Sequence, residues 1–510
     1  MSPPTATLPR KLWTPPHPER SRMAAFMRRA NARHSLGLRT FNELYEWSVG
    51  AHDDRTRLDF WQLLWEEIGV IHEGRYTRVV DLAARMDSVP RWFDGVRLNF
   101  AENVLFFAAA GKPGARMTAG GKEDGKVAVT EVREGGTEVR HVSWGELRAR
   151  VGLFENAMKA RGVRRGDRVA VVASNSLDTL CVFLAVTALG GLFSSSSTDM
   201  GTKGILDRLT QIKPVWVFVD DWAVYNGKTV DLRPKIKDIV NGMKDVQELK
   251  GVVAQPRWQS RPEDVSGVPR TIALAEFLDA ANGKTDLTFE RVEFRDPFLI
   301  VYSSGTTGIP KCIVHSVGGV LTSTLKESIL HRDFGPSTVM LQYTTTGWIM
   351  YLSSVLSLLS GSRSVLYDGS PFQPDLKAFV RLISEQKVTH LGISPRWMHE
   401  YQKNGLSPRE IADLNSLRGV TSTGMVLKDQ LCEWFYDVGF PPHVQLANIS
   451  GGTDLAGCFG MDNPLMPLYV GGCQGPSLGT PVVVFDQLDE GGIGVKGRQV
   501  EDGTPGELVA

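Results

Sequence analysis

The chain has 510 residues, of which 42% are hydrophobic, so it can bury more than one large core. Its 57 lysines and arginines balance 57 aspartates and glutamates, and this neutrality gives no support for a nucleic-acid or anionic-membrane partner. No run reaches the roughly 20 apolar residues of a membrane span. The longest candidate, residues 180–193, is shorter and predicts a buried helix.

The five cysteines are odd in number and never form a CxxC pair. This pattern argues for a reducing compartment and against a disulfide framework or a zinc site. The N-terminus lacks an apolar signal core, and residues 507–510 carry no peroxisomal tripeptide. We therefore expect a cytoplasmic protein.

The first part of the chain is rich in aromatic residues and arginine. Residues 1–110 predict a helical N-terminal cap, because their apolar residues recur at helical spacing. Two short strands, 127–132 and 139–142, flank a glycine pair as in a hairpin. Ser143 and Glu146 then form the capping box of the next helix.

Further along, apolar strands alternate with helices. The predicted strands span residues 168–173, 215–219, 298–302, 364–367, 388–393, 419–423 and 444–448. Their near-continuous apolar runs indicate an α/β fold with mainly parallel sheets sandwiched by helices. Near the end, residues 481–486 and 496–500 predict short antiparallel strands of a small β-barrel-like subdomain. The expected units are the cap at 1–110, an α/β core at 111–475 and the start of the barrel-like subdomain at 476–510.

The strongest chemical signal directly follows the strand at 298–302. The residues are Ser303, Ser304, Gly305, Thr306, Thr307, Gly308, Ile309, Pro310 and Lys311. The glycines let the backbone come close to a phosphate, whose oxygens can be bound by amides, hydroxyls and the lysine. The spacing of a Walker A loop is absent. The alternative reading, a flexible polar turn, leaves this run of small and hydroxyl-bearing residues unexplained.

This loop resembles the phosphate loop of the adenylate-forming superfamily, which includes acyl-CoA synthetases, peptide adenylation domains and luciferases. In that family the loop embraces the β- and γ-phosphates of ATP. The resemblance assigns this role to residues 303–311, with Thr306 and Lys311 as catalytic groups. It also implies the large N-terminal domain of these enzymes, built on two mainly parallel sheets, and the use of ATP, Mg²⁺ and CoA.

Other family motifs follow in the same order. Residues 342–348 resemble the aromatic segment that lines the acyl and nucleotide pocket. Gly424, Met425 and Val426 stand in the place of the adenine platform, where contacts would run through the backbone. Residues 503–509 resemble the turn that closes the large domain.

The segment 448–454 comes just after a strand, at the edge where α/β folds bind ligands. By resemblance, Asn448 would bind the adenine amino group and Thr453 would face the α-phosphate. Asp454 replaces the usual Glu and would offer Mg²⁺ a carboxylate oxygen. An ordinary helix N-cap is the alternative reading of Asp454. The same resemblance places the nucleotide beside three further residues, Ile449, Ser450 and Gly452.

The acyl pocket would be formed around a glycine. Acetyl-CoA synthetases carry Trp at the position of Gly451, so its loss opens space for a longer acid. The other expected lining residues are Trp348, Ile349, Met350 and Thr423. The strings 92–95, 98–103 and 450–454 are typical of acetoacetyl-CoA synthetases, which implies acetoacetate as the substrate. The motifs assign no residue to its 3-keto oxygen, and a plain turn glycine is the alternative reading of Gly451.

The implied activity is that of an acid–thiol ligase. The carboxylate attacks the α-phosphorus of ATP and expels pyrophosphate, and CoA then takes the acyl group. No side-chain nucleophile is required, so catalysis would consist of positioning and charge neutralisation. The family's small C-terminal domain is expected to be absent, which would impair the thioester step. Two alternatives stay open: a synthetase for another short acid such as propionate or butyrate, and a non-catalytic truncated nucleotide-binding fragment.

Overall fold

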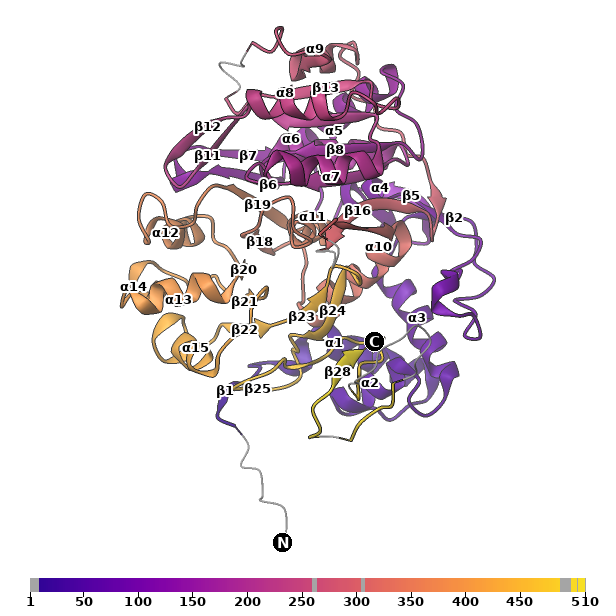
Figure 1. Cartoon of the computed structure of the whole chain (residues 1–510). Coiled ribbons are helices and arrows are strands. Elements are labelled where there is room, and N and C mark those ends of the chain that lie inside the picture. Colours follow the sequence, from indigo (N-terminus) through magenta and orange to yellow (C-terminus); the bar gives the residue numbers. More distant parts are fainter. Residues whose placement is uncertain (1–8, 259–263, 304–307, 487–496, 502, 510) are drawn as a thin grey trace.

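Two seven-stranded sheets organise the protein. The computed structural model describes residues 9–258, 264–303, 308–486, 497–501 and 503–509. Figure 1 shows the first sheet in the magenta upper part of the molecule and the second running from β19 down to β22 on the orange side.

The first sheet is parallel except at one edge. Its strand order is β14 (Thr271–Ala273), β13 (Gly251–Gln255), β10 (Trp216–Asp220), β8 (Arg168–Val172), β9 (Leu192–Ser196), β16 (Pro297–Ser303) and β17 (Lys311–Ser316). Only β16 and β17 pair antiparallel. These two strands are the ones that flank the predicted phosphate loop.

The second sheet has the same plan. Its order is β22 (Gln445–Asn448), β21 (Gly419–Ser422), β20 (His390–Ile393), β18 (Val339–Gln342), β19 (Arg363–Asp368), β6 (Val127–Arg133) and β7 (Val139–Ser143). All pairs are parallel except the hairpin of β6 and β7, which turns through η3 (Glu134–Gly136). The predicted α/β class, hairpin and strand series are confirmed.

The two sheets share one core and each has a second, outer core. Along β8, Val169 and Val171 join the shared core, whereas Ala170 and Val172 join the outer one, because side chains alternate between the faces of a strand. The second sheet is likewise covered on both faces. The arrangement is therefore five layers deep, with helices between the sheets and outside each of them.

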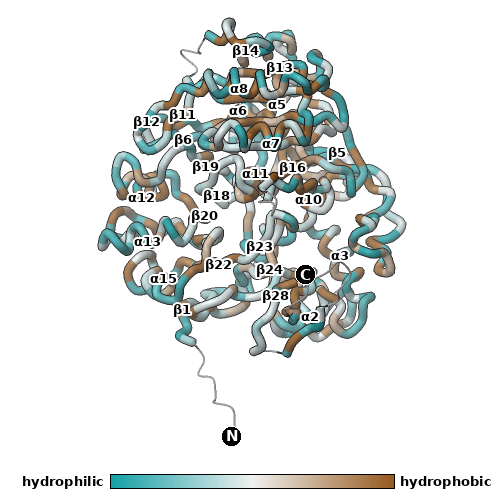
Figure 2. Tube along the Cα trace, in the orientation of Figure 1, coloured by the Kyte–Doolittle hydropathy of each residue, from teal (hydrophilic) through white to brown (hydrophobic). Residues whose placement is uncertain are grey.

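The helices divide among these layers. The shared core receives side chains from α4 (Phe100–Leu105), α5 (Trp144–Ala160), α6 (Leu177–Ala188), α9 (Leu274–Asp279), α10 (Val317–Lys326) and α11 (Tyr351–Leu356). The outer face of the first sheet carries α7 (Thr202–Ile212) and α8 (Arg233–Gly242). The second carries α12 (Ala378–Glu385), α13 (Pro395–Lys403), α14 (Pro408–Ile411) and α15 (Asp429–Trp434). Figure 2 shows teal and brown alternating along α12, α13 and α15, as expected of amphipathic helices with one solvent-exposed face.

Helix α6 is buried on all sides, as its apolar sequence predicts. Phe183 stacks on Phe193 of β9 with ring centroids 4.3 Å apart, and it also contacts the ring of Tyr351 of α11. The prediction of one helix over 180–193 is wrong at its end, because α6 ends at Ala188 and β9 begins at Leu192. No helix in the described part of the chain is both long and apolar enough to cross a membrane.

The capping box at the start of α5 is confirmed. Ser143 Oγ accepts a hydrogen bond from the Glu146 amide at 3.2 Å, and the Glu146 carboxylate accepts one from the Ser143 amide at 2.7 Å. This reciprocal pair fixes where the helix leaves β7.

The N-terminal region combines helices with short strands. Its helices are α1 (Arg22–His34), α2 (Phe41–Val49) and α3 (Asp54–Ile68), seen in indigo at the lower right of Figure 1. Strand β1 (Lys11–Trp13) pairs with β25 (Leu468–Tyr469), and β3 (Arg97–Leu98) lies between β2 (His72–Glu73) and β15 (Val292–Glu293). Small hairpins join β4 (Phe107–Ala109) to β5 (Lys112–Met117) and β11 (Trp222–Tyr225) to β12 (Lys228–Asp231). Single turns form η1 (Pro18–Arg20), η2 (Met86–Ser88), η5 (Ser357–Ser360) and η6 (Phe435–Gly439).

The C-terminal strands form small sheets. A three-stranded sheet contains β23 (Ser450–Gly452), β24 (Gly457–Met461) and β26 (Gly475–Pro476). Strand β27 (Val483–Phe485) lies within the predicted 481–486 and pairs with β28 (Glu507–Val509), while Gln499 makes a single bridge to Phe485. Lys496 lies outside the described residues. Among the described residues these strands close no barrel.

Candidate active site

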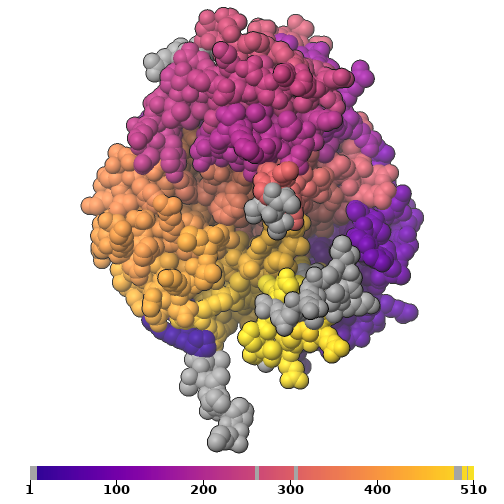
Figure 3. Space-filling view, in the orientation of Figure 1, coloured from indigo at the N-terminus to yellow at the C-terminus, as the bar shows by residue number. Residues whose placement is uncertain are grey.

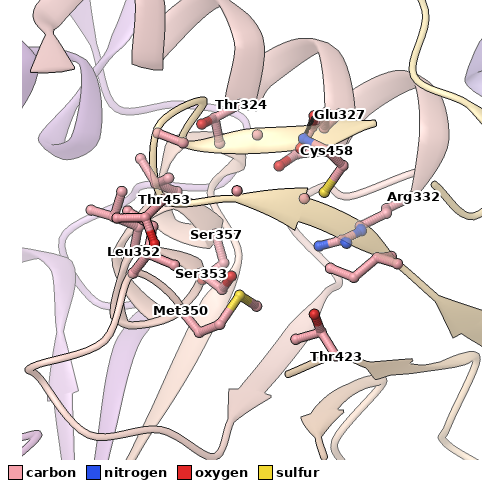
Figure 4. A pocket seen from close by; sticks show the side chains of 18 of the residues that line it. Thr324, Glu327, Arg332, Met350, Leu352, Ser353, Ser357, Thr423, Thr453 and Cys458 are labelled. Carbon is pink, nitrogen blue, oxygen red and sulfur yellow. Dashed lines mark hydrogen bonds between the residues drawn. The ribbon is translucent and has the colours of Figure 1, made fainter. Parts of the chain in front are cut away.

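A cavity of about 230 Å³ opens where the loops after β18, β21 and β22 meet. In parallel sheets, such a place at the carboxyl ends of strands is where ligands bind. Its walls come from segments far apart in sequence, at residues 324–334, 348–357, 423–424 and 449–458. Figure 4 shows these side chains around the strands β23 and β24, with Thr324 and Glu327 above the strands and Met350, Ser353, Ser357 and Thr423 below them.

The structure brings together the five residues that the sequence assigns to the acyl pocket, because all of them line this cavity: Trp348, Ile349, Met350, Thr423 and Gly451. Trp348 is 38% exposed although it lines the cavity.

The loop after β21 needs a glycine. Gly424 has φ +89°, a region that side chains disfavour, and a Cβ placed there would meet the Trp348 ring at 3.1 Å. A side chain at this position would thus press against the edge of the indole. The next two residues, Met425 and Val426, are 60% and 87% exposed.

The turn after β22 forms the opposite wall. Ile449 is buried, and the strand Ser450–Gly452 pairs with β24. The Asn448 amide donates a hydrogen bond to the Gly472 carbonyl at 3.0 Å. Thr453 lines the cavity and Asp454 follows it on an exposed turn, not at the start of a helix.

The neighbouring strand leaves no space for a side chain at Gly451, in addition to the effect that a side chain would have on the size of the pocket. A Cβ at this position would lie 2.4 Å from the Gly457 carbonyl oxygen on β24, closer than real Cβ contacts. A Cβ at Gly452 would meet nothing nearer than 3.8 Å. The two neighbouring glycines therefore differ, and only the first is required by the close approach of the strands.

The predicted phosphate loop begins at Ser303 and ends at Lys311, which face each other across β16 and β17. Gly308 has φ +80° and, like Lys311, is exposed. Four predicted ligands, Ser304, Gly305, Thr306 and Thr307, lie outside the described residues. In Figure 3 the coral surface of this region lies at the centre of one face, between the magenta, orange and yellow parts of the chain.

A hydrogen bond joins this hairpin to the opposite turn. His315 Nε2 on β17 donates to the Thr453 carbonyl oxygen at 2.8 Å. Burial lowers the pKa of His315 below its ordinary value, although the bond to Thr453 and the nearby Asp454 charge act the other way, so the ring is neutral at pH 7. The strand that follows the predicted phosphate loop is thus tied to the turn at Thr453, at a point four residues beyond Lys311.

The rear of the cavity is polar, which the sequence motifs do not predict. It is formed by Glu327 and Ser328 of the π-helical turn η4 (Glu327–His331), by Arg332 directly after it, and by Cys458 of β24. Glu327 Oε1 accepts hydrogen bonds from the Cys458 amide at 3.0 Å and from Ser477 Oγ at 3.4 Å.

Arg332 remains a cation in this buried place. Its Nε donates to Asp462 Oδ1 at 3.3 Å. Burial works against the charge, but Asp462, Cys458 and Glu327 together raise the pKa of Arg332 above its ordinary value. The sequence feature that could have indicated this polar wall is the group of charged residues at 326–327 and 331–333, which lies inside an otherwise apolar helical run.

Comparison with known proteins agrees with this geometry. Residues 117–510 match the model of the family described as AMP-binding enzyme. An acetoacetyl-CoA synthetase of Mus musculus is 37% identical, over 96% of this chain and 70% of the mouse protein. A malonamoyl-CoA synthetase of Penicillium aethiopicum is 34% identical, over 98% of this chain and 68% of that protein.

A solved structure extends the comparison to the fold. The acetoacetyl-CoA synthetase from Streptomyces lividans superimposes with a TM-score of 0.82 at 31% identity, covering 94% of this chain and 70% of that one. The chain therefore belongs to the AMP-binding enzyme family and is homologous to its acetoacetyl-CoA synthetases.

Proposed function

We propose that this protein is an acid–thiol ligase that activates acetoacetate with ATP to acetoacetyl-AMP and passes the acyl group to CoA. The observation that carries the proposal is the cavity in which Trp348, Met350, Thr423 and Gly451 meet, next to the hairpin of the phosphate loop. The names of the mouse and Streptomyces relatives support acetoacetate as the acid.

The residues divide into three roles in the adenylation step. The loop 303–311 would bind the β- and γ-phosphates, with Thr306 and Lys311 offsetting the charge that moves onto pyrophosphate. Thr453 would face the α-phosphate, at the mouth of the acyl cavity. Asn448 and the backbone of 424–426 would hold the adenine. The acid's carboxylate supplies the nucleophile, so no side-chain base is needed.

The proposal includes Mg²⁺ bound with the nucleotide. Asp454 is an exposed carboxylate next to Thr453, and carboxylate oxygen is the kind of ligand this ion prefers. When bound, the ion supplies positive charge to the phosphates.

The substrate class is a short 3-oxo acid. Acetoacetate and malonamate, the acid implied by the name of the Penicillium relative, both carry a carbonyl on C3 and differ in a methyl against an amino group. Butyrate and propionate lack that carbonyl. The polar rear wall at Glu327 and Arg332 favours an acid with a polar group at this position over a saturated one.

We also propose a cytoplasmic location. The five cysteines Cys181, Cys312, Cys432, Cys458 and Cys473 are free thiols, which suits a reducing compartment. Its partners in this proposal are the small molecules acetoacetate, ATP and CoA, without a nucleic acid.

The test is calorimetric titration of the full chain with a non-hydrolysable acetoacetyl-sulfamoyl-adenosine, which mimics the adenylate. The expected result is saturable binding that ATP and MgCl₂ together displace. Lys311→Ala should weaken ATP binding and leave the affinity for the mimic, which has no β- or γ-phosphate, within a few-fold of wild type. Failure of the wild-type chain to bind the mimic would refute the proposed function.

A further inference from the structure

The positively charged side chain of Arg332 lies at the end of the acyl cavity opposite Thr453. Figure 4 shows the Arg332 side chain extending into the space between β24 and Thr423, with its guanidinium group leading. The side chain is only 11% exposed. It faces Met350 and Thr423 across the same space, and the Thr423 hydroxyl points toward it.

Arg332 has more donors than partners. A guanidinium has five N–H donors. Within the described residues its hydrogen bonding is confined to the contact of Nε with Asp462, and neither terminal nitrogen has a protein acceptor. Arg332 also borders a second cavity, so a saturated acyl chain would exclude water from the acyl side of the guanidinium and leave the donors that face it unsatisfied, which is costly in a buried site. An acid with an acceptor at this point avoids that cost.

The π-helical turn directs both charged side chains to the cavity. Residues five apart in an α-helix point about 140° away from each other. The i→i+5 hydrogen bonding of a π turn brings such residues close to register. Glu327 opens η4 and Arg332 directly follows it, and both line the cavity. Such single π turns are frequent at functional sites.

The charges around Arg332 favour a neutral acceptor. Asp462 is 7% exposed and bonded to the guanidinium, and Glu327 lines the same cavity. The buried Lys326 beside Glu327 is a second cation, so two carboxylates balance two cations and leave no net positive charge for a second carboxylate of the substrate. A ketone or amide oxygen accepts the hydrogen bond without adding charge. This end of the cavity therefore discriminates against dicarboxylic acids as well as against saturated acids.

We propose that Arg332 donates a hydrogen bond to the C3 oxygen of the bound acid and so selects 3-oxo acids over their saturated counterparts. The proposal rests on the adenylation function proposed above, because it takes the acid's carboxylate to lie at the Thr453 end. Asp462 is a positioning residue that holds the guanidinium through Nε.

The test compares two adenylate mimics, acetoacetyl- and butyryl-sulfamoyl-adenosine, which differ in the C3 oxygen. By calorimetric titration the wild-type chain should bind the acetoacetyl mimic about 10- to 100-fold more tightly, the range of a hydrogen bond to a charged group. Arg332→Met keeps a long unbranched side chain without donors. It should bring the two affinities within about threefold of each other while retaining the butyryl affinity.

Two further variants separate recognition from structure. Asp462→Asn keeps the guanidinium and an oxygen that can accept its Nε hydrogen bond, so it should keep the preference for the acetoacetyl mimic even if the protein melts at a lower temperature. If Arg332→Met fails to fold because Asp462 is left buried and unpaired, the double variant Arg332→Met with Asp462→Leu removes both charges and replaces the single variant in the comparison.

The outcomes are distinct for the two proposals. A wild-type chain that binds neither mimic refutes the adenylation function itself. Equal wild-type affinity for the two mimics overturns the role of Arg332 while leaving adenylation intact. So does a wild-type preference that persists unchanged in Arg332→Met or in the double variant.

Discussion

Replacing Gly451 with alanine should disturb the acyl cavity through the backbone. The added Cβ would lie 2.4 Å from the Gly457 carbonyl oxygen, whereas carbon–oxygen contacts between strands are normally about 3.3 Å or longer. The strands β23 and β24 would thus have to separate by about 0.9 Å at this point. Overpacking of this kind costs about 1–3 kcal/mol.

The displaced strand leads directly into Thr453 and forms one wall of the cavity, so binding should suffer together with stability. We expect Gly451→Ala to lower the unfolding free energy by about 1–3 kcal/mol. We also expect it to weaken the acetoacetyl-sulfamoyl-adenosine complex at least about tenfold, or roughly 1.4 kcal/mol.

The matched control is Gly452→Ala. Its Cβ would meet no atom closer than 3.8 Å, an ordinary contact. Chemical denaturation and calorimetric titration of the two variants side by side give the answer. Wild-type stability and affinity in Gly451→Ala, or equal losses in both variants, would show that the spacing of β23 and β24 does not determine this glycine.

Two further predictions concern buried charge. Glu102 is 1% exposed and accepts hydrogen bonds from Arg291 at 2.8 and 2.9 Å. Glu102→Ala should therefore lower the free energy of unfolding, measured in guanidinium chloride, by about 3–5 kcal/mol. The control, Asp87→Ala at an exposed ion pair, should lower it by about 1 kcal/mol or less. Burial lowers the pKa of His331 from 6.5 to about 3, so the unfolded chain binds the extra proton first and the unfolding free energy should fall as the pH drops from about 6.5 toward 3. His331→Asn should make this fall shallower by up to about 1.4 kcal/mol per pH unit, whereas the exposed His52→Asn should not; identical slopes in wild type and His331→Asn would contradict the reasoning.

The sequence predicts those parts of the fold that local pattern determines. The capping box of Ser143 and Glu146 and the hairpin of β6 and β7 depend on residues close in sequence, and both are confirmed. The predicted helix over 180–193 runs into a strand, because a short apolar run covered on both faces reads alike as helix or strand.

In the candidate site, too, some residues can be predicted from local sequence motifs and others only from the folded structure. Trp348, Thr423 and Gly451 belong to motifs with recognisable spacing, and the structure brings them to one cavity. Arg332 belongs to no motif, because its role depends on how η4 lies against β24, more than 120 residues away in sequence. A charged residue in an apolar helical run signals that something must pair with it, but the sequence alone does not say what.

The two walls of the cavity place different demands on a substrate. Trp348, Ile349 and Met350 offer apolar surface, which binds any short acyl chain roughly in proportion to the area it buries. Such contacts cannot strongly distinguish acetoacetate from butyrate, since the two differ little in shape. Arg332 can, because an unpaired buried donor penalises the acid that lacks an acceptor. The apolar wall, which the sequence motifs identify, therefore selects acids by size. The wall at Arg332, which forms only in the folded chain, selects them by the presence of an acceptor.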